Sequence, residues 1–216
     1  MMGKRSPEQK EKPHLGDLVI ATGNPAKFVR YERGLADHFD VNLTSLQEEG
    51  LEKVDEPFDT AEENARHKAI NYFRQCGKPV LAIDEALYFD FLPADKQPGV
   101  YVRRFGGTEE LSDADLLTRI QDLVKDVPDE KRTGYWRYAV CIAQGEDKVG
   151  EVIFDNHLRV ASRASEKESP GYPLNKIIQN EGLERVNVEC SDEDRRKADE
   201  VFMGKVIKAV RKAYGI

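Results

Sequence analysis

The sequence predicts a mixed α/β fold, a sheet of strands with helices around it, on three observations. Short apolar runs alternate with amphipathic stretches in the first half of the chain, which is typical of alternating strands and helices. Two later apolar runs flank Gln144-Gly145-Glu146-Asp147, a turn signal that favours a hairpin. The last stretch has apolar residues at helical spacing.

The first elements are a strand, a tight turn and a helix. Leu18-Val19-Ile20-Ala21 is a short apolar run, and Thr22-Gly23-Asn24-Pro25 is a turn signal before an amphipathic stretch over residues 26–38. Residues 41–46 are expected to form a second strand. The segment 47–59 that follows is acidic and irregular.

A second helix is expected over residues 60–75. Thr60 is a candidate N-cap with Glu63 three positions on, which is the capping-box spacing. The next apolar run, residues 80–83, predicts a strand that ends at Asp84-Glu85. The remaining elements follow in order: an extended segment at 87–92, a loop at 93–107, a helix at 112–124, strands at 135–143 and 148–154, a polar loop at 162–173 and a helix at 192–214.

The composition fits one domain with a heavily charged surface. Of the 216 residues, 39% are hydrophobic, enough for a core, and 34% are charged. Residues 1–15 are charged and lack an apolar signal core, so we interpret them as a disordered leader before a single domain at 16–216. A net charge of -7 argues against binding to a nucleic-acid polymer, although a local basic pocket for a small phosphorylated ligand is compatible with it.

The cysteines and the hydropathy exclude further classes. The three cysteines are far apart, odd in number and without metal-ligand spacing, so we expect no disulfide framework. No apolar stretch is long enough to span a bilayer, and a cytoplasmic location is the default expectation.

The turn from Thr22 to Lys27 is the first candidate binding element. A glycine-containing turn between a strand and a helix presents backbone N–H groups and the positive end of a helix dipole, which suits a phosphate. Lys27, in the first helical turn, adds a positive charge. The alternative is a simple turn with a surface lysine, because such connections are common in α/β proteins.

Two acids are candidates for holding a metal ion on a polyphosphate. Asp84 follows an apolar run, and ligands gather at the carboxyl ends of strands in open α/β sheets. A second carboxylate from a loop, Glu56, completes a set that suits Mg²⁺. The alternatives are that Glu56 is one of many solvated acids and that Asp84 is a cap or turn residue.

Polar and basic residues are candidates to contact the same anion. Asn64 and Lys68 are four apart and share a helix face, although this face is alternatively exposed, with Glu63 paired to His67. Two arginines follow the rigid Pro98-Gly99 turn and either grip an anion or pair with surface acids.

A basic run near the start of the last helix is a further candidate. Asp194-Arg195-Arg196-Lys197 lies where positive charge is unfavourable for the helix dipole unless an anion is near, but the acids at 192–194 offset this. The histidines at 14, 38 and 157 have no triad-like context, and we find neither a Ser/His/Asp nor a Cys/His arrangement.

Taken in this order, the segments resemble the inosine triphosphate pyrophosphatase family, the Ham1-like proteins. The resemblance covers about Leu18 to Ala198. It rests on Ala21-Thr22-Gly23-Asn24 with Lys27, Thr60-Ala61-Glu62-Glu63-Asn64-Ala65 with Lys68-Ala69, Leu81-Ala82-Ile83-Asp84-Glu85-Ala86-Leu87, Pro98-Gly99-Val100-Tyr101 with Arg104-Phe105-Gly106-Gly107, Gly171-Tyr172, and Arg195 with Ala198.

The resemblance implies an elongated, curved mixed sheet with flanking helices and a central cleft, usually in a homodimer. It implies attack of water on a nucleoside triphosphate with Mg²⁺, or Mn²⁺ in its place, releasing pyrophosphate and a nucleoside monophosphate. Asp84 would orient or deprotonate the water. The implied metal ligands are Glu56 and Asp84, with Glu85 as an added ligand, and the implied substrate contacts are Thr22, Asn24, Lys27, Asn64, Lys68, Arg104, Tyr172 and Arg195.

Departures from the family pattern concern mainly the base. Ile83 replaces the first of two acids, and Glu85-Ala86 replaces a Ser-Gly pair. The loop 169–174 keeps the stacking aromatic, Tyr172, but has Pro173 where the family has a base-reading Asp. We therefore predict a pyrophosphatase with altered base specificity. The alternatives are a nucleotide-binding or regulatory protein of this fold that has lost hydrolysis, and an acidic interaction protein without a nucleotide site.

Overall fold

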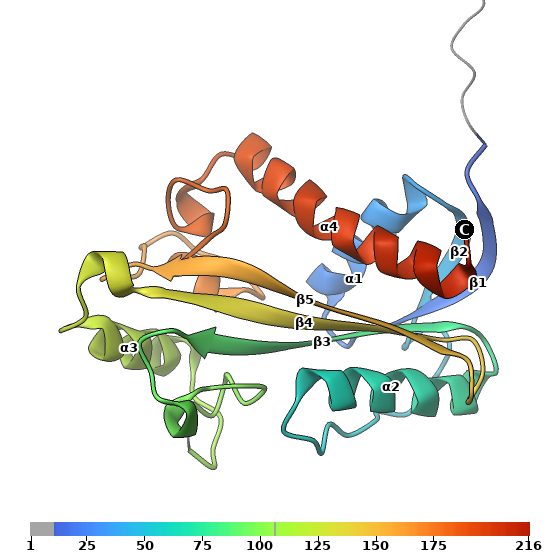
Figure 1. Ribbon diagram of the computed structural model, residues 1–216, viewed down its shortest axis with the longest axis horizontal. Coiled ribbons are helices and arrows are strands. Elements are labelled where there is room, and N and C mark those ends of the chain that lie inside the picture. Colours follow the sequence, from blue (N-terminus) through green and yellow to red (C-terminus); the bar gives the residue numbers. More distant parts are fainter. Residues whose placement is uncertain (1–10, 106) are drawn as a thin grey trace, which may run out of the picture.

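A six-stranded mixed sheet forms the centre of the molecule (Figure 1). The computed structural model describes residues 11–105 and 107–216. β1 pairs in parallel with β2 and with β3, whereas β3 to β6 pair antiparallel in sequence order, so the predicted mixed sheet is confirmed. The order is β2-β1-β3-β4-β5-β6, with β1 at His14–Ala21, β2 at Asp40–Ser45, β3 at Val80–Phe89, β4 at Thr133–Ala143, β5 at Val149–Val160 and β6 at Ile178–Asn180.

Four α-helices surround the sheet in the part of the chain that the structure describes. They are α1 at Pro25–Ala36, α2 at Ala61–Cys76, α3 at Asp113–Val124 and α4 at Asp192–Tyr214. Figure 1 shows the long strands β3, β4 and β5 running between α4 on one side and α2 on the other. Within residues 11–105 and 107–216, no helix combines the length and the apolar character needed to cross a membrane.

The two faces of the sheet carry separate cores. Side chains alternate between the faces of a strand, so Leu81 and Ile83 of β3 pack with α1 and α4, while Ala82 and Ala86 pack with α2. A third cluster forms where α3 covers the far ends of β3 and β5. Small alanines on the α2 face bring that helix close to β3, and this places the polar residues of α2 beside the strand.

Local signals in the sequence are confirmed at several element ends. Thr60 accepts a hydrogen bond from the Glu63 amide at 3.2 Å, the expected N-cap, and the return bond of the capping box is made by the Thr60 hydroxyl, which donates to the Glu63 carboxylate at 2.6 Å. Ser112 caps α3 by accepting from the Asp115 amide. The hairpin between β4 and β5 turns where it was expected, with the Gln144 amide donating to the Lys148 carbonyl at 2.9 Å.

Several predicted boundaries are wrong: β5 runs to Val160, for example, where a strand end at residue 154 was expected. Two others lie at the start of β1 and at the end of β3. The leader was expected to extend to residue 15, but β1 begins at His14, which is held by its pairing with Asp40; the first ten residues lie outside those described. The strand expected to end at Asp84-Glu85 continues to Phe89. The two acids are tolerated in mid-strand because each has its own lysine partner, Lys68 for Asp84 and Lys27 for Glu85.

Candidate active site

A cleft of about 1720 Å³ opens beside β3, between α1, α2 and the start of α4. Its walls come from both faces of β3, from the β1–α1 turn and from the loops around residues 51–57, 100–104 and 171–175. The structure brings every candidate residue from the sequence to this cleft: Thr22, Asn24, Lys27, Glu56, Asn64, Lys68, Asp84, Glu85, Arg104, Tyr172 and Arg195.

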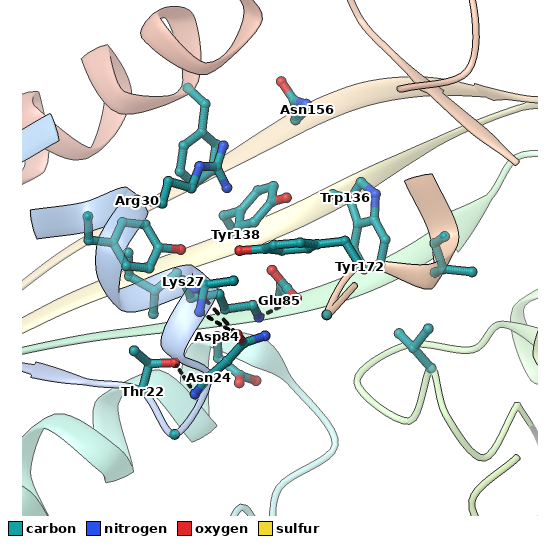
Figure 2. A pocket seen from close by; sticks show the side chains of 18 of the residues that line it. Thr22, Asn24, Lys27, Arg30, Asp84, Glu85, Trp136, Tyr138, Asn156 and Tyr172 are labelled. Carbon is teal, nitrogen blue, oxygen red and sulfur yellow. Dashed lines mark hydrogen bonds and ion pairs between the residues drawn. The ribbon is translucent and has the colours of Figure 1, made fainter. Parts of the chain in front are cut away.

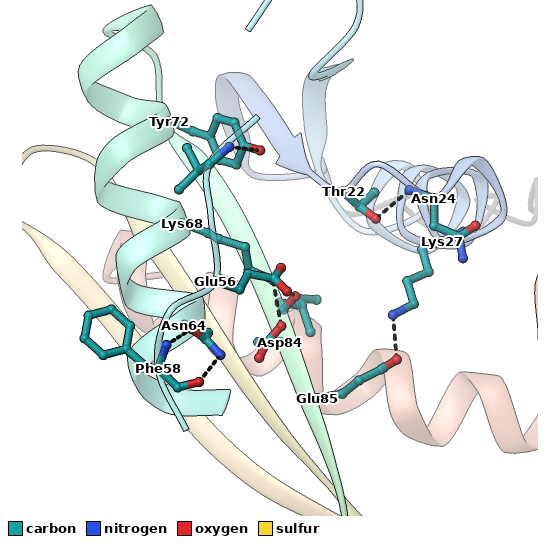
Figure 3. A network of polar contacts seen from close by, with 12 residues as sticks. Thr22, Asn24, Lys27, Glu56, Phe58, Asn64, Lys68, Tyr72, Asp84 and Glu85 are labelled. Carbon is teal, nitrogen blue, oxygen red and sulfur yellow. Dashed lines mark hydrogen bonds and ion pairs between the residues drawn. The ribbon is translucent and has the colours of Figure 1, made fainter. Parts of the chain in front are cut away.

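Lys68 lies between two carboxylates on the α2 side of β3 (Figure 3). Its ammonium donates to Asp84 at 2.7 Å and to Glu56 at 2.8 Å, and it also reaches the Ile83 carbonyl at 3.2 Å. The side chains of Lys68 and Asp84 are only 8% and 12% exposed, whereas that of Glu56 is 52% exposed. The three charges therefore form a cluster that is buried on the strand side and open to the cleft at Glu56.

Burial and charge act in opposite directions on this cluster. Burial raises the pKa of Asp84, and the nearby Glu56 and Glu85 add to this, although the Lys68 ammonium opposes it. The pKa of Lys68 is also raised: burial alone would lower it, but Asp84 and Glu56 outweigh that effect. A carboxylate with raised proton affinity is better suited to accept a proton near neutral pH.

The carboxylate pair suits a hard cation such as Mg²⁺. Mg²⁺ is usually held in proteins by one or two carboxylates together with water and substrate phosphates. Glu56 and Asp84 meet that requirement, since both reach the same ammonium. Among the residues that the structure describes, no group of three or more His, Cys, Asp or Glu side chains is arranged to hold a metal ion.

Glu85 is not brought to this pair, which corrects the expectation that it joins the metal ligands. Neighbouring side chains on a strand point to opposite faces, so Glu85 faces α1 while Asp84 faces α2. The Glu85 carboxylate accepts a hydrogen bond from the Lys27 ammonium at 2.6 Å (Figures 2 and 3). The alternation was available from the sequence, but it applies only if the strand continues through both acids.

The β1–α1 turn is organised by its own side chains. Asn24 caps α1, with its side-chain oxygen accepting from the Ala26 amide at 2.9 Å and from the Lys27 amide at 3.4 Å. Thr22 accepts from the Asn24 amide at 3.2 Å. Burial alone would lower the pKa of Lys27, but Glu85 outweighs it and the pKa is raised. The turn thus presents a lysine that stays charged at the cleft.

Asn64 and Arg195 have backbone partners in the structure. Asn64 is 1% exposed, and its amide both accepts from the Phe58 amide and donates to the Phe58 carbonyl, each at 3.0 Å. It therefore fixes the loop that carries Glu56, and the alternative of an exposed helix face is wrong. Arg195 donates to the carbonyls at 187, 188 and 190, which orders the segment before α4.

The two arginines after the Pro98-Gly99 turn have different partners. Arg103 pairs with Asp113 of α3, as the surface-pair alternative predicts. Arg104 lies 5.2 Å from the centre of the Tyr101 ring and lines the cleft. Both arginines line the cleft, but Arg103 is held by Asp113 and Arg104 has no such acid partner among the ion pairs of the described residues.

An aromatic group on the α1/α4 side was missed in the sequence. Tyr31 and Arg30 lie one helical turn beyond Lys27, and Tyr138 of β4 stands opposite Glu85 in the strand register. Arg30 pairs with Asp199 of α4 and lies 3.8 Å over the Phe202 ring. The i, i+3 and i+4 spacing from Lys27 was a usable signal, whereas the contributions from β4 and α4 depend on tertiary structure.

Fold and cleft together define an α/β protein whose charged cleft is lined from both faces of one central strand. The model of the Ham1 family matches residues 18–210, and this chain belongs to the Ham1 family. The resemblance predicted from the sequence is thereby confirmed.

Curated relatives include proteins named dITP/XTP pyrophosphatase. One from Bacillus cereus is 30% identical over 182 residues, covering 84% of this chain and 87% of that protein. One from Photorhabdus laumondii is 34% identical over 131 residues, but the match covers only 60% of this chain and 64% of the relative. The match thus spans less than two thirds of some relatives and most of others.

Solved structures share the fold. A dITP/XTP pyrophosphatase from Mycobacterium abscessus has a TM-score of 0.67 at 24% identity, with 90% of this chain and 98% of that chain covered. A HAM1 protein from Coxiella burnetii has a TM-score of 0.68 at 20% identity, with coverages of 90% and 100%. The predicted fold class is therefore confirmed.

Proposed function

We propose that this protein hydrolyses a nucleoside triphosphate to a nucleoside monophosphate and pyrophosphate in a reaction that requires Mg²⁺ or Mn²⁺. The observation that carries this proposal is the Asp84–Lys68–Glu56 cluster, buried at Asp84 and Lys68 and exposed at Glu56, in a cleft large enough for a nucleotide. The names of the Bacillus cereus and Photorhabdus laumondii relatives, dITP/XTP pyrophosphatase, support the same activity.

The residues of the cleft have different roles in such a hydrolysis. Lys27, Lys68 and Arg104 supply positive charge to the phosphates, as phosphoryl transfer needs charge neutralisation and positioning more than covalent chemistry. Asp84 accepts the proton of the attacking water, helped by its raised pKa. A divalent ion held by Glu56 and Asp84 would neutralise charge on the phosphate oxygens.

Asn64 and Arg195 act indirectly in this scheme. Asn64 holds the Phe58 backbone and so keeps Glu56 facing Lys68. Arg195 orders the segment at 187–190, of which Asn187 lines the cleft. We assign both as positioning residues.

We propose a base preference different from that of the relatives named for dITP and XTP. Tyr172 remains in the cleft wall as a stacking surface, but Pro173 follows it and offers no side-chain hydrogen bond to a base. A site that lacks the partner for a base loses discrimination for that base. The aromatic and charged side chains on the α1/α4 side supply other contacts.

The test is release of pyrophosphate from a panel of triphosphates with Mg²⁺, for the wild type and for Asp84→Asn. The panel includes ITP, XTP, the common ribo- and deoxyribonucleotides and modified bases. We expect turnover of one class, reduced by about 10²- to 10⁴-fold in Asp84→Asn because the proton acceptor is lost. Asp122→Asn is the matched control, since Asp122 is exposed on α3 and does not line the cleft.

A second candidate is a nucleotide-binding protein without hydrolysis. It is favoured by the closed pairing in the cleft, where Lys68 engages both carboxylates and Glu85 engages Lys27. Tight binding of a triphosphate with no pyrophosphate release in either Mg²⁺ or Mn²⁺ would replace the enzyme proposal with this one. Turnover that survives undiminished in Asp84→Asn would contradict the assigned role of Asp84.

A further inference from the structure

A chamber on the α1/α4 side of β3 forms one end of the cleft. We call it the tyrosine chamber, because Tyr31, Tyr138 and Tyr172 line it together with Lys27 and Glu85. Figure 2 shows the Glu85 carboxylate beside the Lys27 ammonium and close to the ring of Tyr172, with Tyr138 on the same side of β3. The carboxylate cluster at Asp84 lies across the strand, so the two ends of the cleft are chemically distinct.

The chamber is lined by tyrosine hydroxyls that open to the cleft. Tyr31 and Tyr138 are only 2% and 8% exposed as whole residues, but neither hydroxyl is among the fully buried polar atoms without a partner in the described residues. Both side chains line the cleft, so their hydroxyls are available to a ligand bound in the chamber.

Ion pairs offset most of the charge around the chamber, with the exposed Arg33 as a second cation near Asp199. Lys27 is paired with Glu85, and Arg30 is paired with Asp199 of α4. An aromatic chamber whose charge is mostly offset favours the uncharged parts of a nucleotide, its sugar and base, over its phosphates. The α2 side, by contrast, has two carboxylates for one lysine and suits a cation with the phosphates.

Glu85 lies between the residues assigned to the phosphates and to the base. It bonds Lys27 on one side, and its charge raises the pKa of Tyr172 on the other, where burial is the larger cause of the increase. In a nucleotide, the sugar joins the phosphates to the base. One Glu85 oxygen accepts from Lys27, and the other has no partner among the described residues. An ionised carboxylate only accepts hydrogen bonds, and sugar hydroxyls donate them.

We propose that Glu85 accepts a hydrogen bond from the 2′-hydroxyl of ribose, so that this protein selects ribonucleoside over 2′-deoxyribonucleoside triphosphates. The inference rests on the proposed function for the identity of the ligand as a nucleotide. A site built to bond a substrate hydroxyl rejects the analogue without it, because the Glu85 carboxylate, 29% exposed in the free protein, is left unsatisfied when such a ligand covers it and excludes water. The selection would set this chain apart from relatives whose name includes the deoxyribonucleotide dITP.

The test compares kcat/KM for matched ribo and 2′-deoxy triphosphates of each base in the panel. In the wild type we expect a ribo preference on the order of 10- to 100-fold, as for a hydrogen bond to a charged group. Glu85→Ser should abolish that ratio, and Glu85→Gln should leave an intermediate one because its amide oxygen still accepts. Lys27→Met removes the other member of the same ion pair. It should lower kcat/KM equally for the ribo and the 2′-deoxy triphosphates, which leaves their ratio unchanged.

Binding of the matched monophosphates by calorimetry gives a readout independent of turnover. Ribo-selective binding that Glu85→Ser abolishes, without any hydrolysis, supports the inference while the proposed hydrolysis fails. Hydrolysis with the same ribo-to-deoxy ratio in the wild type and Glu85→Ser overturns the inference and leaves the enzyme intact. The inference is also overturned if the change in kcat/KM caused by Glu85→Ser varies with the amino groups of the base and not with the sugar.

Discussion

At the scale of single residues, two adjacent acids each place a carboxylate at one end of the cleft. Asp84 and Glu85 are neighbours in β3, and the alternation of the strand sends one toward α2 and the other toward α1. Each acid meets a lysine from the helix on its own side, Lys68 at 2.7 Å and Lys27 at 2.6 Å. One strand therefore separates the Asp84–Lys68–Glu56 cluster from the tyrosine chamber.

Replacing Lys68 tests how strongly its buried cluster depends on charge balance. Lys68→Met leaves Asp84 buried without its cation and beside a second carboxylate, so we expect a loss of about 3 kcal/mol in the free energy of unfolding. Urea denaturation followed by circular dichroism measures this loss. The double variant Lys68→Met/Asp84→Asn should recover part of it, because the uncompensated charge is then removed.

Lys78→Met is the matched control for that experiment. Lys78 pairs with Glu49 at 2.7 Å, but its side chain is 38% exposed, so we expect a much smaller loss in the free energy of unfolding than for Lys68→Met. Equal losses for Lys68→Met and Lys78→Met would contradict the view that burial makes the cleft cluster sensitive to charge balance.

The sequence located the members of the site better than their orientations. Lys27, Lys68 and Asp84 were found from motifs, and all three reach the cleft. Glu85 was assigned to the metal because it replaces the first residue of the family's Ser-Gly pair beside Asp84, and the assignment did not consider the alternation of a continuous strand. The backbone partners of Asn64 depend on a loop six residues upstream folding back onto the helix, and no local pattern predicts that contact.

At the scale of elements, the position of β3 depends on how closely β4 approaches it. Gly134 of β4 pairs with Phe89 at the end of β3, and a Cβ atom at Gly134 would lie 2.2 Å from the Tyr88 carbonyl oxygen. A contact that short with backbone cannot be relieved by a side-chain rotation. The glycine therefore sets the spacing of β3 and β4 at this end of the pair.

Gly134→Ala should destabilise the protein by about 2 kcal/mol, because the two strands must move apart to admit the methyl group. Gly204→Ala in α4 should act in the opposite direction. An added Cβ at Gly204 meets nothing within 4 Å, and alanine in a helix is favoured over glycine by up to about 1 kcal/mol. Thermal unfolding of the two variants beside the wild type measures both effects. If Gly134→Ala is more stable than the wild type, β4 does not approach β3 as closely as described.

The helix ends and the hairpin turn were predictable where neighbouring residues determine them. The capping box at Thr60, the hairpin turn and the extent of α4 agree with their predictions because each depends on neighbouring residues. The continuity of β3 and the three-residue β6 were missed, since both are fixed by partners far away in the chain. Long-range pairing thus determines the strand that carries the site.

At the scale of the whole molecule, the core on the α1/α4 face contains ionisable phenols. Tyr31 and Tyr138 belong to that core, together with residues of β1, β3 and α4. Burial raises the pKa of both phenols above the ordinary value of 10.0, and Glu85 contributes in the same direction. The folded protein therefore keeps these protons at a pH where the unfolded chain releases them.

Stability should fall as the pH rises above about 10, the pKa of an unfolded tyrosine. Below that pH both states hold the protons, and the contribution of the neutral phenols is fully present. One unit above it, each phenol that stays protonated in the fold lowers the free energy of unfolding by about 1.4 kcal/mol. Two such phenols give a loss of about 3 kcal/mol at pH 11, measurable by urea denaturation at pH 8 and pH 11.

The contribution of one phenol can be isolated from other groups that titrate in the same range. Lys27 and Lys68, whose raised pKa values act in the same direction, stay present in both the wild type and Tyr31→Phe. The difference between pH 8 and pH 11 should therefore be smaller in Tyr31→Phe by about 1.4 kcal/mol. Absorbance at 295 nm should show Tyr31 ionising only as the protein unfolds. An unchanged pH dependence in Tyr31→Phe would mean that its hydroxyl already titrates in the folded state, and that the tyrosine chamber admits water freely.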